Sequence, residues 1–414
     1  MALTDSVEEI VEKSNNPLLG KHEAWGRVKL GAVAKVQNGF VFKSELFTKE
    51  KRGMPIIRIR DVGSDNTDTY YTGEYDPEYV VRRGDLLIGM DGDFNSARWR
   101  GPDALLNQRV CRIIPTTDHF EPRLLDFALP GDLKAINDVT SSVTVKHLSS
   151  RTVAEIPLPL PPLPEQRRIV SAIETQLVRL DAAVARLHAA KAQLKRYKQA
   201  VLKAAFTDED WPIVRIGDVY EVFVGSTPSR AKPQFWNGTV PWVSSGEVAF
   251  CEIHETRERI ATEALGNSEK RLHPAGTVIL AMIGEGKTRG QAAILRIPAA
   301  HNQNTAAIRM PDDLHSPEYL YYYFLYEYEN TRRVGSGNNQ MALNKSRIQD
   351  IELPLPDAEE QVRTALAIRD RFEVLAETET TLDAQLAQST RLRQAVLKRA
   401  FEGRLVGGVE PRIR

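Results

Sequence analysis

The stretch Leu158-Pro-Leu-Pro-Pro-Leu-Pro-Glu-Gln-Arg-Arg-Ile169 begins a segment that occurs twice in this 414-residue chain. Shifting the sequence by 195 positions aligns residues 156–206 with residues 351–401 without a gap. Both copies begin with Leu-Pro-Leu-Pro, continue with Glu-Gln and end on Gln-Ala-Val-Leu-Lys, and roughly forty residues in each are free of Gly and Pro. An extended, Pro-rich start before a long run without helix breakers predicts one long helix in each copy.

The apolar residues of the two predicted helices recur mostly at alternating intervals of four and three, the pattern of a coiled-coil seam. Lys191, Glu379 and Ser389 interrupt the seams. Because a whole domain separates the copies, we expect antiparallel pairing, which would give the chain a pseudo-twofold axis and a rigid spacer about 60 Å long. The apolar seam residues are Ile173, Leu177, Leu180, Val184, Leu187, Leu194 and Val201 in the first helix, and Ile368, Phe372, Leu375, Leu382, Leu386 and Val396 in the second.

The regions before the two helical segments also resemble each other. Trp25–Gly31 matches Trp211–Gly217, and Asn107-Gln108 matches Asn302-Gln303. Both regions contain short β-like runs broken by Gly and Asp, so each is expected to be a mainly β domain with a few helices. The predicted fold class is α+β, with two mainly β domains alternating with the two paired helices. We place an N-terminal segment at 1–24, the first domain at 25–155, the first linker and helix at 156–206, the second domain at 211–350, the second linker and helix at 351–406, and a tail at 407–414.

Composition excludes several classes of protein. Lys and Arg together number 55, as do Asp and Glu, so any DNA-binding surface has to be local. Cys111 and Cys251 are far apart in the sequence, and the eight histidines show no ligand spacing, which argues against disulfides and a structural metal. No stretch has the pattern of a signal peptide or a membrane span, so we expect a reducing, cytoplasmic compartment.

The repeated motifs resemble those of the specificity subunits of type I restriction-modification systems. The resemblance covers nearly the whole chain, and its most specific marks are the motif at Leu158–Ile169, the sequence QAVLKAAF at Gln199–Phe206, and their second copies from Leu353 and Gln394. The segment GDLLIGMDGDFNSARWRG at Gly84–Gly101 is similar to one common type of recognition domain. The second copy departs from the pattern, because it reads LPLPDAEEQVRTA.

The resemblance implies a chain that recognises double-stranded DNA and has no catalytic residue, metal or cofactor of its own. It implies two recognition domains that each read one half of a bipartite, asymmetric site. Two modification subunits, which carry the S-adenosylmethionine site and methylate adenine, are expected to dock on the helices. The resemblance leaves open whether two restriction subunits, which use ATP and Mg, also join.

The alternative is a self-contained adenine methyltransferase or nuclease. A methyltransferase needs an Asn/Asp-Pro-Pro-aromatic motif, but the one Pro-Pro pair, Pro161-Pro162, is followed by Leu163. Gly284–Thr288 imitates a phosphate-binding loop, yet Ala281 occupies the place of the first glycine and a β-like run follows. Pro102-Asp103 with Asp132–Lys134 fits a nuclease layout only loosely, as short combinations do by chance.

Polar loops are the candidates for DNA contact, because Arg can bond guanine in a bidentate manner, Asn and Gln can bond adenine, and Lys and Thr can hold phosphates. We expect Lys287, Thr288, Arg289 and Gln291 at the place in the second domain that matches Asn95, Arg98, Trp99 and Arg100 in the first. The alternative is a solvated loop with Trp99 packed on the core. Further candidates, which could instead satisfy buried backbone groups, are Asn107, Gln108, Arg109, Asn302, Gln303, Asn338, Asn339 and Gln340.

The ends of the helical repeat are the candidates for partner docking, because polar residues recur there in both copies. Helix capping is the alternative for the first turn, where Glu and Gln are common. The first helix also carries nine Lys and Arg against three Asp and Glu, which indicates either a solvated face or contact with DNA or an acidic partner. The predicted docking residues are Glu165, Gln166, Gln199, Leu202, Lys203 and Phe206, with Glu360, Gln361, Gln394, Leu397, Lys398 and Phe401 in the second copy.

Overall fold

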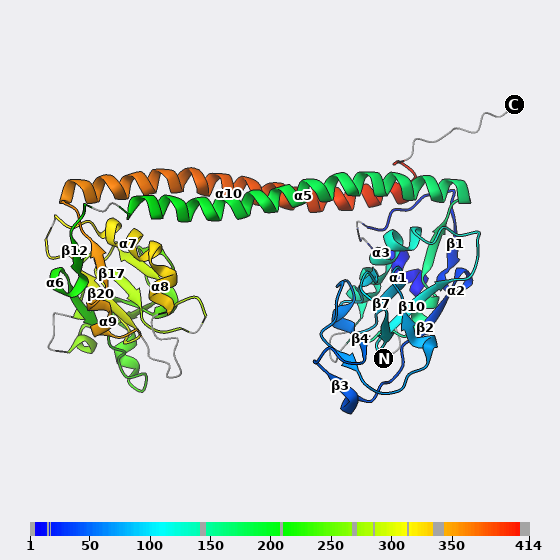
Figure 1. Ribbon diagram of the computed structural model, residues 1–414, viewed down its shortest axis with the longest axis horizontal. Helices are drawn as coiled ribbons and strands as arrows, with labels where there is room; N and C mark the ends of the chain where they lie inside the picture. The colour runs from blue at the N-terminus through cyan, green and yellow to red at the C-terminus, as the bar shows by residue number, and fades with distance from the viewer. Residues whose placement is uncertain are drawn as a thin grey trace. The chain divides into compact units, whose positions relative to one another are not determined.

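A computed structural model describes residues 5–14, 16, 18–140, 146–207, 210–266, 271–284, 286–312, 314–333 and 343–405. The chain divides into two compact units. The first unit combines residues 1–187 with 384–414, and the second contains residues 188–383. Each long helix therefore contributes one end to each unit (Figure 1).

The first unit is built on a β domain that comprises strands β1 to β11, which we call the first β domain. Its sheets have the strand orders β2-β10-β7-β8, β3-β5-β4-β9-β6 and β1-β11. Its helices are α1 (Val7–Lys13), α2 (Leu30–Val33), α3 (Leu124–Val139) and α4 (Ser150–Ala154). The strands are β1 (Gly26–Lys29), β2 (Ala34–Asn38), β3 (Phe47–Thr48), β4 (Met54–Ile57), β5 (Tyr70–Tyr71), β6 (Val80–Val81), β7 (Leu86–Gly89), β8 (Ser96–Arg98), β9 (Ala104–Leu106), β10 (Val110–Pro115) and β11 (Pro157–Leu160).

The second unit is built on a similar β domain, β12 to β21, which we call the second β domain. Its sheets have the orders β13-β20-β17-β18-β15, β16-β14-β19 and β12-β21. Its helices are α6 (Ile216–Val219), α7 (Pro317–Tyr326), α8 (Tyr328–Arg333) and α9 (Lys345–Gln349). The strands are β12 (Ile213–Arg215), β13 (Glu221–Val224), β14 (Val240–Val243), β15 (Cys251–Ile253), β16 (Glu258–Ile260), β17 (Val278–Ala281), β18 (Ala292–Leu295), β19 (Ala300–His301), β20 (Thr305–Arg309) and β21 (Glu352–Pro354).

The two domains repeat the same pairing scheme. In the first, β10 pairs antiparallel with β2 and β7, and β4 pairs parallel with β9. In the second, β20 pairs antiparallel with β13 and β17, and β14 pairs parallel with β19. The strands that form the centres of both domains, such as β7 and β17, are buried along their whole length, which explains their continuous apolar sequence.

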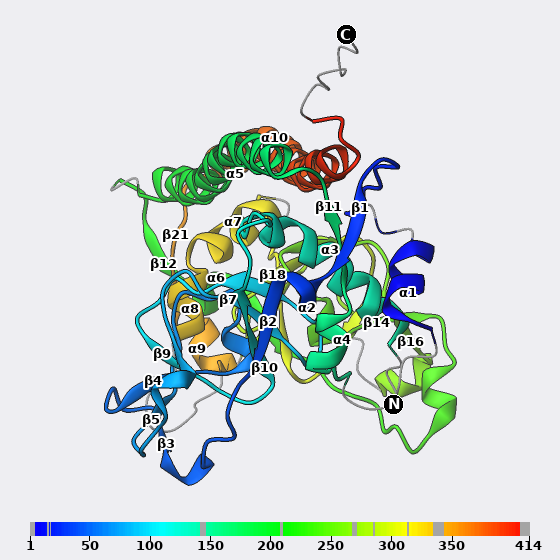
Figure 2. The same ribbon diagram turned by 90° about the vertical axis from the view of Figure 1, so that its right-hand side faces the viewer.

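The two predicted long helices are α5 (Leu163–Ala205) and α10 (Ala358–Phe401), which lie side by side (Figures 1 and 2). In the second unit Lys191 pairs with Asp383 at 2.6 Å and Lys198 pairs with Glu379 at 2.8 Å. Because the partner's number falls as the residue number rises, the helices are antiparallel, and this prediction is confirmed. Two of the polar residues that interrupt the predicted seams, Lys191 and Glu379, thus find charged partners on the other helix.

Candidate nucleic-acid interface and helical frame

One end of each β domain collects most of the predicted DNA-contacting residues. We call it the loop end, and it consists of the segments that follow β4, β7 and β9 in the first domain and β14, β17 and β19 in the second. Parallel pairing explains why two of these segments meet: Ile57 lies opposite Leu106, and Val243 lies opposite His301. Because parallel strands end at the same edge of a sheet, the residues after β4 and β9 emerge together, as do those after β14 and β19.

The third segment reaches the loop end through the antiparallel sheet. Gly89, the last residue of β7, lies opposite Val110, the first residue of β10. The backbone N–H of Met90 donates to the carbonyl oxygen of Arg109 at 2.9 Å, and that of Met282 donates to the carbonyl oxygen of Asn304 at 2.9 Å. The loops after β7 and β17 are therefore fastened to the segments that contain Asn107–Arg109 and Asn302–Asn304.

In the first β domain, Asn95, Gln108 and Arg109 are exposed at the loop end. The side-chain amide of Asn95 donates to the carbonyl oxygen of Val62 at 2.9 Å, and Arg109 lies 3.6 Å from the carboxylate of Asp91. Arg109 has a φ of 70°, an uncommon backbone conformation for a residue with a side chain. Asn107 is 7% exposed, and its Oδ1 has no hydrogen-bond partner among the residues that the structure describes.

In the second β domain, Lys287 and Gln303 are exposed, whereas Thr288, Arg289 and Gln291 are half-buried. The hydroxyl of Tyr328 on α8 donates to the carbonyl oxygen of Lys287, which holds the loop after β17. Asn302 is buried, and its Oδ1 accepts from the backbone N–H of Asn304 at 3.2 Å. Residues 338–340, the remaining candidates, lie outside the described residues.

Arg98, Trp99 and Arg100 lie at the opposite end of the first β domain. Arg98 is opposite Leu86, the first residue of β7, and so lies far from Gly89. Its guanidinium donates to the carboxylate of Asp126 at 2.7 Å and to the carbonyl oxygens of Gly84 and Pro122. Trp99 is 1% exposed and donates to the carbonyl oxygen of Pro102 at 2.6 Å, whereas Arg100 is exposed.

The expected match of Arg98, Trp99 and Arg100 with the group Lys287–Gln291 does not agree with the strand register. Leu86 pairs with Arg98, whereas the equivalent Val278 pairs with Ile294, so Arg98 corresponds to Ile294. By the same register Asn95 corresponds to Gln291. The loop after β17 contains more residues than the loop after β7, and that difference in length shifted the sequence match.

Two buried histidines support the loop end of the second β domain, and no local sequence pattern indicates their contact. Nε2 of His273 lies 3.2 Å from Nε2 of His301, and Nδ1 of His273 accepts from Nε of Arg309 at 2.9 Å. Nδ1 of His301 contacts the hydroxyl of Thr305 at 2.8 Å, and that hydroxyl donates to the carbonyl oxygen of Asn302. Burial lowers the pKa of His273 to about 3 and that of His301 to about 4, so both rings are neutral near pH 7.

The repeated glutamines bind the start of each long helix to its own β domain. In the first unit Gln166 is 1% exposed, accepts from the backbone N–H of Glu121 at 2.7 Å and donates to the carbonyl oxygen of Pro161 at 2.8 Å. In the second unit Gln361 is 2% exposed, accepts from the backbone N–H of Ser316 at 3.1 Å and donates to the carbonyl oxygen of Pro356 at 2.9 Å. The same internal bonds explain why this glutamine occurs in both copies.

The repeated apolar residues at the helix ends are also internal. Leu202 and Phe206 of the first repeat belong to the core of the second unit, where the ring of Phe206 lies 5.2 Å from that of Tyr319. Leu397 and Phe401 of the second repeat belong to the core of the first unit. The exposed members of the predicted docking set are Gln199, Lys203 and Lys398, and the half-buried members are Glu165, Glu360 and Gln394.

Comparison with known proteins identifies the family. The model of the type I restriction modification DNA specificity domain matches residues 22–195 and 208–388. The chain is 33% identical to the specificity subunit of the type I restriction enzyme EcoBI of Escherichia coli, over 98% of this chain and 91% of that protein. The chain belongs to the type I restriction-modification DNA specificity family. The EcoR124I/EcoR124II specificity subunit of Escherichia coli is 24% identical over 60% of this chain and 62% of its own length.

Solved structures share the fold of this specificity subunit. One, from a study of complex assembly and conformational transition of the type I R-M system, covers 92% of this chain and 98% of its own with a TM-score of 0.72 and 20% identity. The HsdS subunit from Thermoanaerobacter tengcongensis covers 93% of this chain and 98% of its own with a TM-score of 0.53 and 20% identity. Family membership makes the chain a non-catalytic DNA-recognition subunit that assembles with other restriction-modification subunits.

The residues that loosely fit a nuclease layout, Asp103 and Asp132–Lys134, do not lie together in one polar site. Asp132 is 2% exposed in α3, and burial raises the pKa of its carboxyl to about 8. Lys134 pairs with Asp138 at 2.9 Å, and Asp103 is exposed. Among the residues that the structure describes, no three or more His, Cys, Asp or Glu side chains are grouped as metal ligands. None of the helices in the described ranges is long and apolar enough to cross a membrane.

Proposed function

We propose that the two β domains, residues 25–155 and 211–350, each read one half of a bipartite and asymmetric DNA site through their loop ends. The observation that carries this proposal is that the two loop ends share one scaffold but present different polar groups. The first presents Asn95, Gln108 and Arg109 where the second presents Gln291, Gln303 and Asn304, and the second adds Lys287 and Thr288. Different polar groups at equivalent places favour different bases, which makes the two half-sites unlike.

The long helices, within residues 156–206 and 351–406, are the proposed spacer between the two readers. An uninterrupted helix of 43 residues such as α5 extends about 65 Å at about 1.5 Å per residue. The charged pairs Lys191–Asp383 and Lys198–Glu379 across the seam support a single register of the pair. A single register favours one preferred gap between the half-sites.

Two copies of one modification subunit are the proposed partners, because the exposed part of the repeat offers the same groups twice. The exposed Lys203 recurs as the exposed Lys398, and the exposed Gln199 recurs as the half-buried Gln394. The exposed Tyr197 occupies the place of the exposed Leu392. Glu165 and Glu360 are the further candidates at the other end of each repeat. In this proposal S-adenosylmethionine is bound by the modification partner and ATP and Mg by a restriction partner, in the cytoplasm where the DNA is.

The test is to express the chain with its modification subunits and to sequence the methylated adenines of the host DNA. We expect one motif with two unlike halves and a fixed gap. Removing the matched heptads Leu187–Gln193 and Ala384–Thr390 together shortens the paired helices by about 10 Å and preserves their seam. Both half-sites should then remain and the gap should change. A gap that ignores the deletion would contradict the spacer role, and a motif without two halves would contradict two readers.

A further inference from the structure

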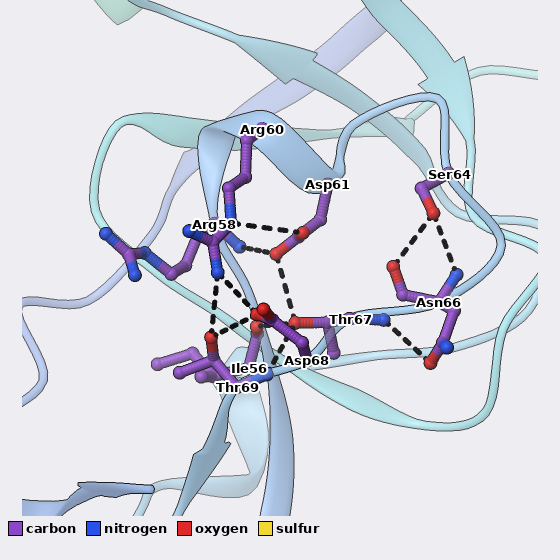
Figure 3. A network of polar contacts seen from close by, with 9 residues as sticks. All are labelled: Ile56, Arg58, Arg60, Asp61, Ser64, Asn66, Thr67, Asp68 and Thr69. Carbon is purple, nitrogen blue, oxygen red and sulfur yellow. Dashed lines mark hydrogen bonds and ion pairs between the residues drawn. The ribbon is translucent and has the colours of Figure 1, made fainter. Parts of the chain in front are cut away.

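A carboxylate inside the first β domain fixes the turn that follows β4. The chain leaves the strand and enters a short 3-10 turn, Ile59–Asp61. Asp61 is 7% exposed, and its Oδ2 accepts from the backbone N–H of Arg58 at 2.9 Å and from the hydroxyl of Thr67 at 3.0 Å (Figure 3). The turn therefore has one defined backbone conformation.

The two arginines of this turn have different surroundings. Arg60 is turned toward the network, where its Nε lies 3.7 Å from Oδ1 of Asp61 and its guanidinium pairs with Asp68 (Figure 3). Arg58 is exposed, and Figure 3 shows its side chain extending away from the network. Within the described ranges, the contacts of Arg58 in this network are made by its backbone. Within this turn, Arg60 is therefore held by internal ion pairs, whereas the side chain of Arg58 extends into solvent.

This turn belongs to the loop end. Arg58 directly follows the residue of β4 that lies opposite Leu106 of β9, so it emerges beside Asn107 and Gln108. The side-chain amide of Asn95 donates to the carbonyl oxygen of Val62, one residue beyond the turn. Arg58 is therefore placed with the polar residues that the sequence indicated, although no motif singles out this arginine.

The second β domain repeats the device with other side chains. After β14, Oε2 of Glu247 accepts from the backbone N–H of Ser244 at 2.9 Å and from its hydroxyl at 2.8 Å. Glu247 thus fixes the backbone of Ser244–Gly246 in the way that Asp61 fixes the backbone of Arg58–Arg60: each carboxylate accepts from the N–H three residues earlier. The acidic residue and the turn recur, whereas Arg-Ile-Arg is replaced by Ser-Ser-Gly. A scaffold that is kept while its outward groups change is what two readers of different sequences require.

We propose that Arg58 contacts a base edge in the half-site of the first β domain and that Ser244–Gly246 occupy the equivalent place at the other half-site. An arginine on a fixed backbone can donate two parallel hydrogen bonds to O6 and N7 of a guanine. Asp61 and Glu247 are positioning residues, since they hold the turns without facing the DNA. The inference rests on the proposed reading of two half-sites, and it names a residue that sets the base preference at one position of one half-site.

The test uses the full chain in complex with its modification subunits and a pool of duplexes with randomised positions, from which bound molecules are sequenced. Arg58→Ala should abolish the base preference at one position of one half-site, and binding to the wild-type target should weaken by about 5- to 150-fold. The other half-site should keep its preference. The salt dependence of binding should change little, because the lost contact is to a base and not to a phosphate.

Arg52→Ala is the matched control. Arg52 carries the same charge, is exposed, precedes β4 and, among the described ion pairs, pairs only with nearby Glu50 at 3.2 Å.

Two further variants test the turns. Asp61→Asn should relax the base preference at the same position as Arg58→Ala, while the melting temperature reports whether the chain folds. Ser244→Arg should change the base preference at one position of the other half-site.

An unchanged preference in Arg58→Ala would overturn the inference, as would a uniform loss of affinity with a smaller salt dependence. A wild-type complex that selects no motif would instead overturn sequence-specific reading itself.

Discussion

Replacing Gln166 by Leu should destabilise the first unit, because this glutamine bonds two backbone groups in a buried place. Leu fills a similar volume, so the change leaves the N–H of Glu121 and the carbonyl oxygen of Pro161 without their partner and creates little cavity. A buried polar group that loses its partner costs about 1 to 3 kcal/mol. Two such groups, partly rehydrated at the helix start, predict a loss of about 2 to 4 kcal/mol in the free energy of unfolding.

Hydrogen exchange measured by mass spectrometry can resolve this loss, because it reports each unit separately. In Gln166→Leu, amides of α3 and of the first turns of α5 should exchange faster, with α7 unaffected. Gln361→Leu should produce the mirror result in the second unit, where Ser316 loses its acceptor. Gln199→Leu, on an exposed position of α5, is the control and should change protection by less than about 0.5 kcal/mol.

The internal role of the glutamines would be refuted if Gln166→Leu exchanged like Gln199→Leu. A variant with normal protection that failed to assemble with the modification subunits would instead assign Gln166 to docking. The pair of experiments therefore separates the two interpretations that the sequence left open.

Three other perturbations test other parts of the structure. Lowering the pH from 7 to 5 should destabilise the second unit by about 2 to 4 kcal/mol, because His273 and His301 gain protons in this range only when the unit is unfolded. Their folded pKa values of about 3 and about 4 lie below the unfolded value, so their contribution to stability is full above the unfolded pKa and is lost as the pH falls toward the folded values. Urea titrations measure this loss, and a double variant His273→Gln/His301→Gln with the same pH slope as the wild type would contradict it. Phe206→Ala should cost about 3 to 5 kcal/mol by chemical denaturation, against less than about 0.5 for the exposed Val178→Ala, and equal effects would show that the helix end does not anchor the second unit. Reversing the charge of Lys203 and Lys398 together should weaken assembly with the modification subunits by about tenfold in a pull-down titration without lowering the melting temperature, and the proposed docking surface fails if assembly is unchanged.

The helices could be predicted from the sequence because their pattern is local. Seam residues recur every three or four positions over forty residues, so the period survives the polar interruption at Lys191. The β domains were predictable only as a class. Strand pairing is non-local, and the match of Arg98 with the group Lys287–Gln291 depended on the length of a loop that no local pattern fixes.

The positions of some candidate residues in the fold could be predicted for the same reason. Asn107-Gln108 and Asn302-Gln303 could be paired because the dipeptide itself recurs, and both copies lie at loop ends. The sequence offers no local signal for Arg58, since the proposal for this residue depends on a buried carboxylate that fixes its turn. It also depends on a parallel strand 49 positions away, in the register of Ile57 with Leu106. Such a signal exists only after the sheet has formed.

A motif can recur within one chain because each copy is needed for folding or because each copy binds a partner. Buried residues indicate the first cause and exposed residues the second. Each unit consists of a β domain, the start of the helix that follows it and the end of the other helix, so the chain needs two starts and two ends for its own folding. Gln166 with Gln361, and Phe206 with Phe401, recur for that reason, because each is buried within its unit. Lys203 and Lys398 are exposed in both copies. Lys398 forms an i,i+4 ion pair with Glu402 at 3.8 Å, and such a pair on an exposed lysine contributes little to stability. Their recurrence is therefore the stronger argument for a partner that binds twice.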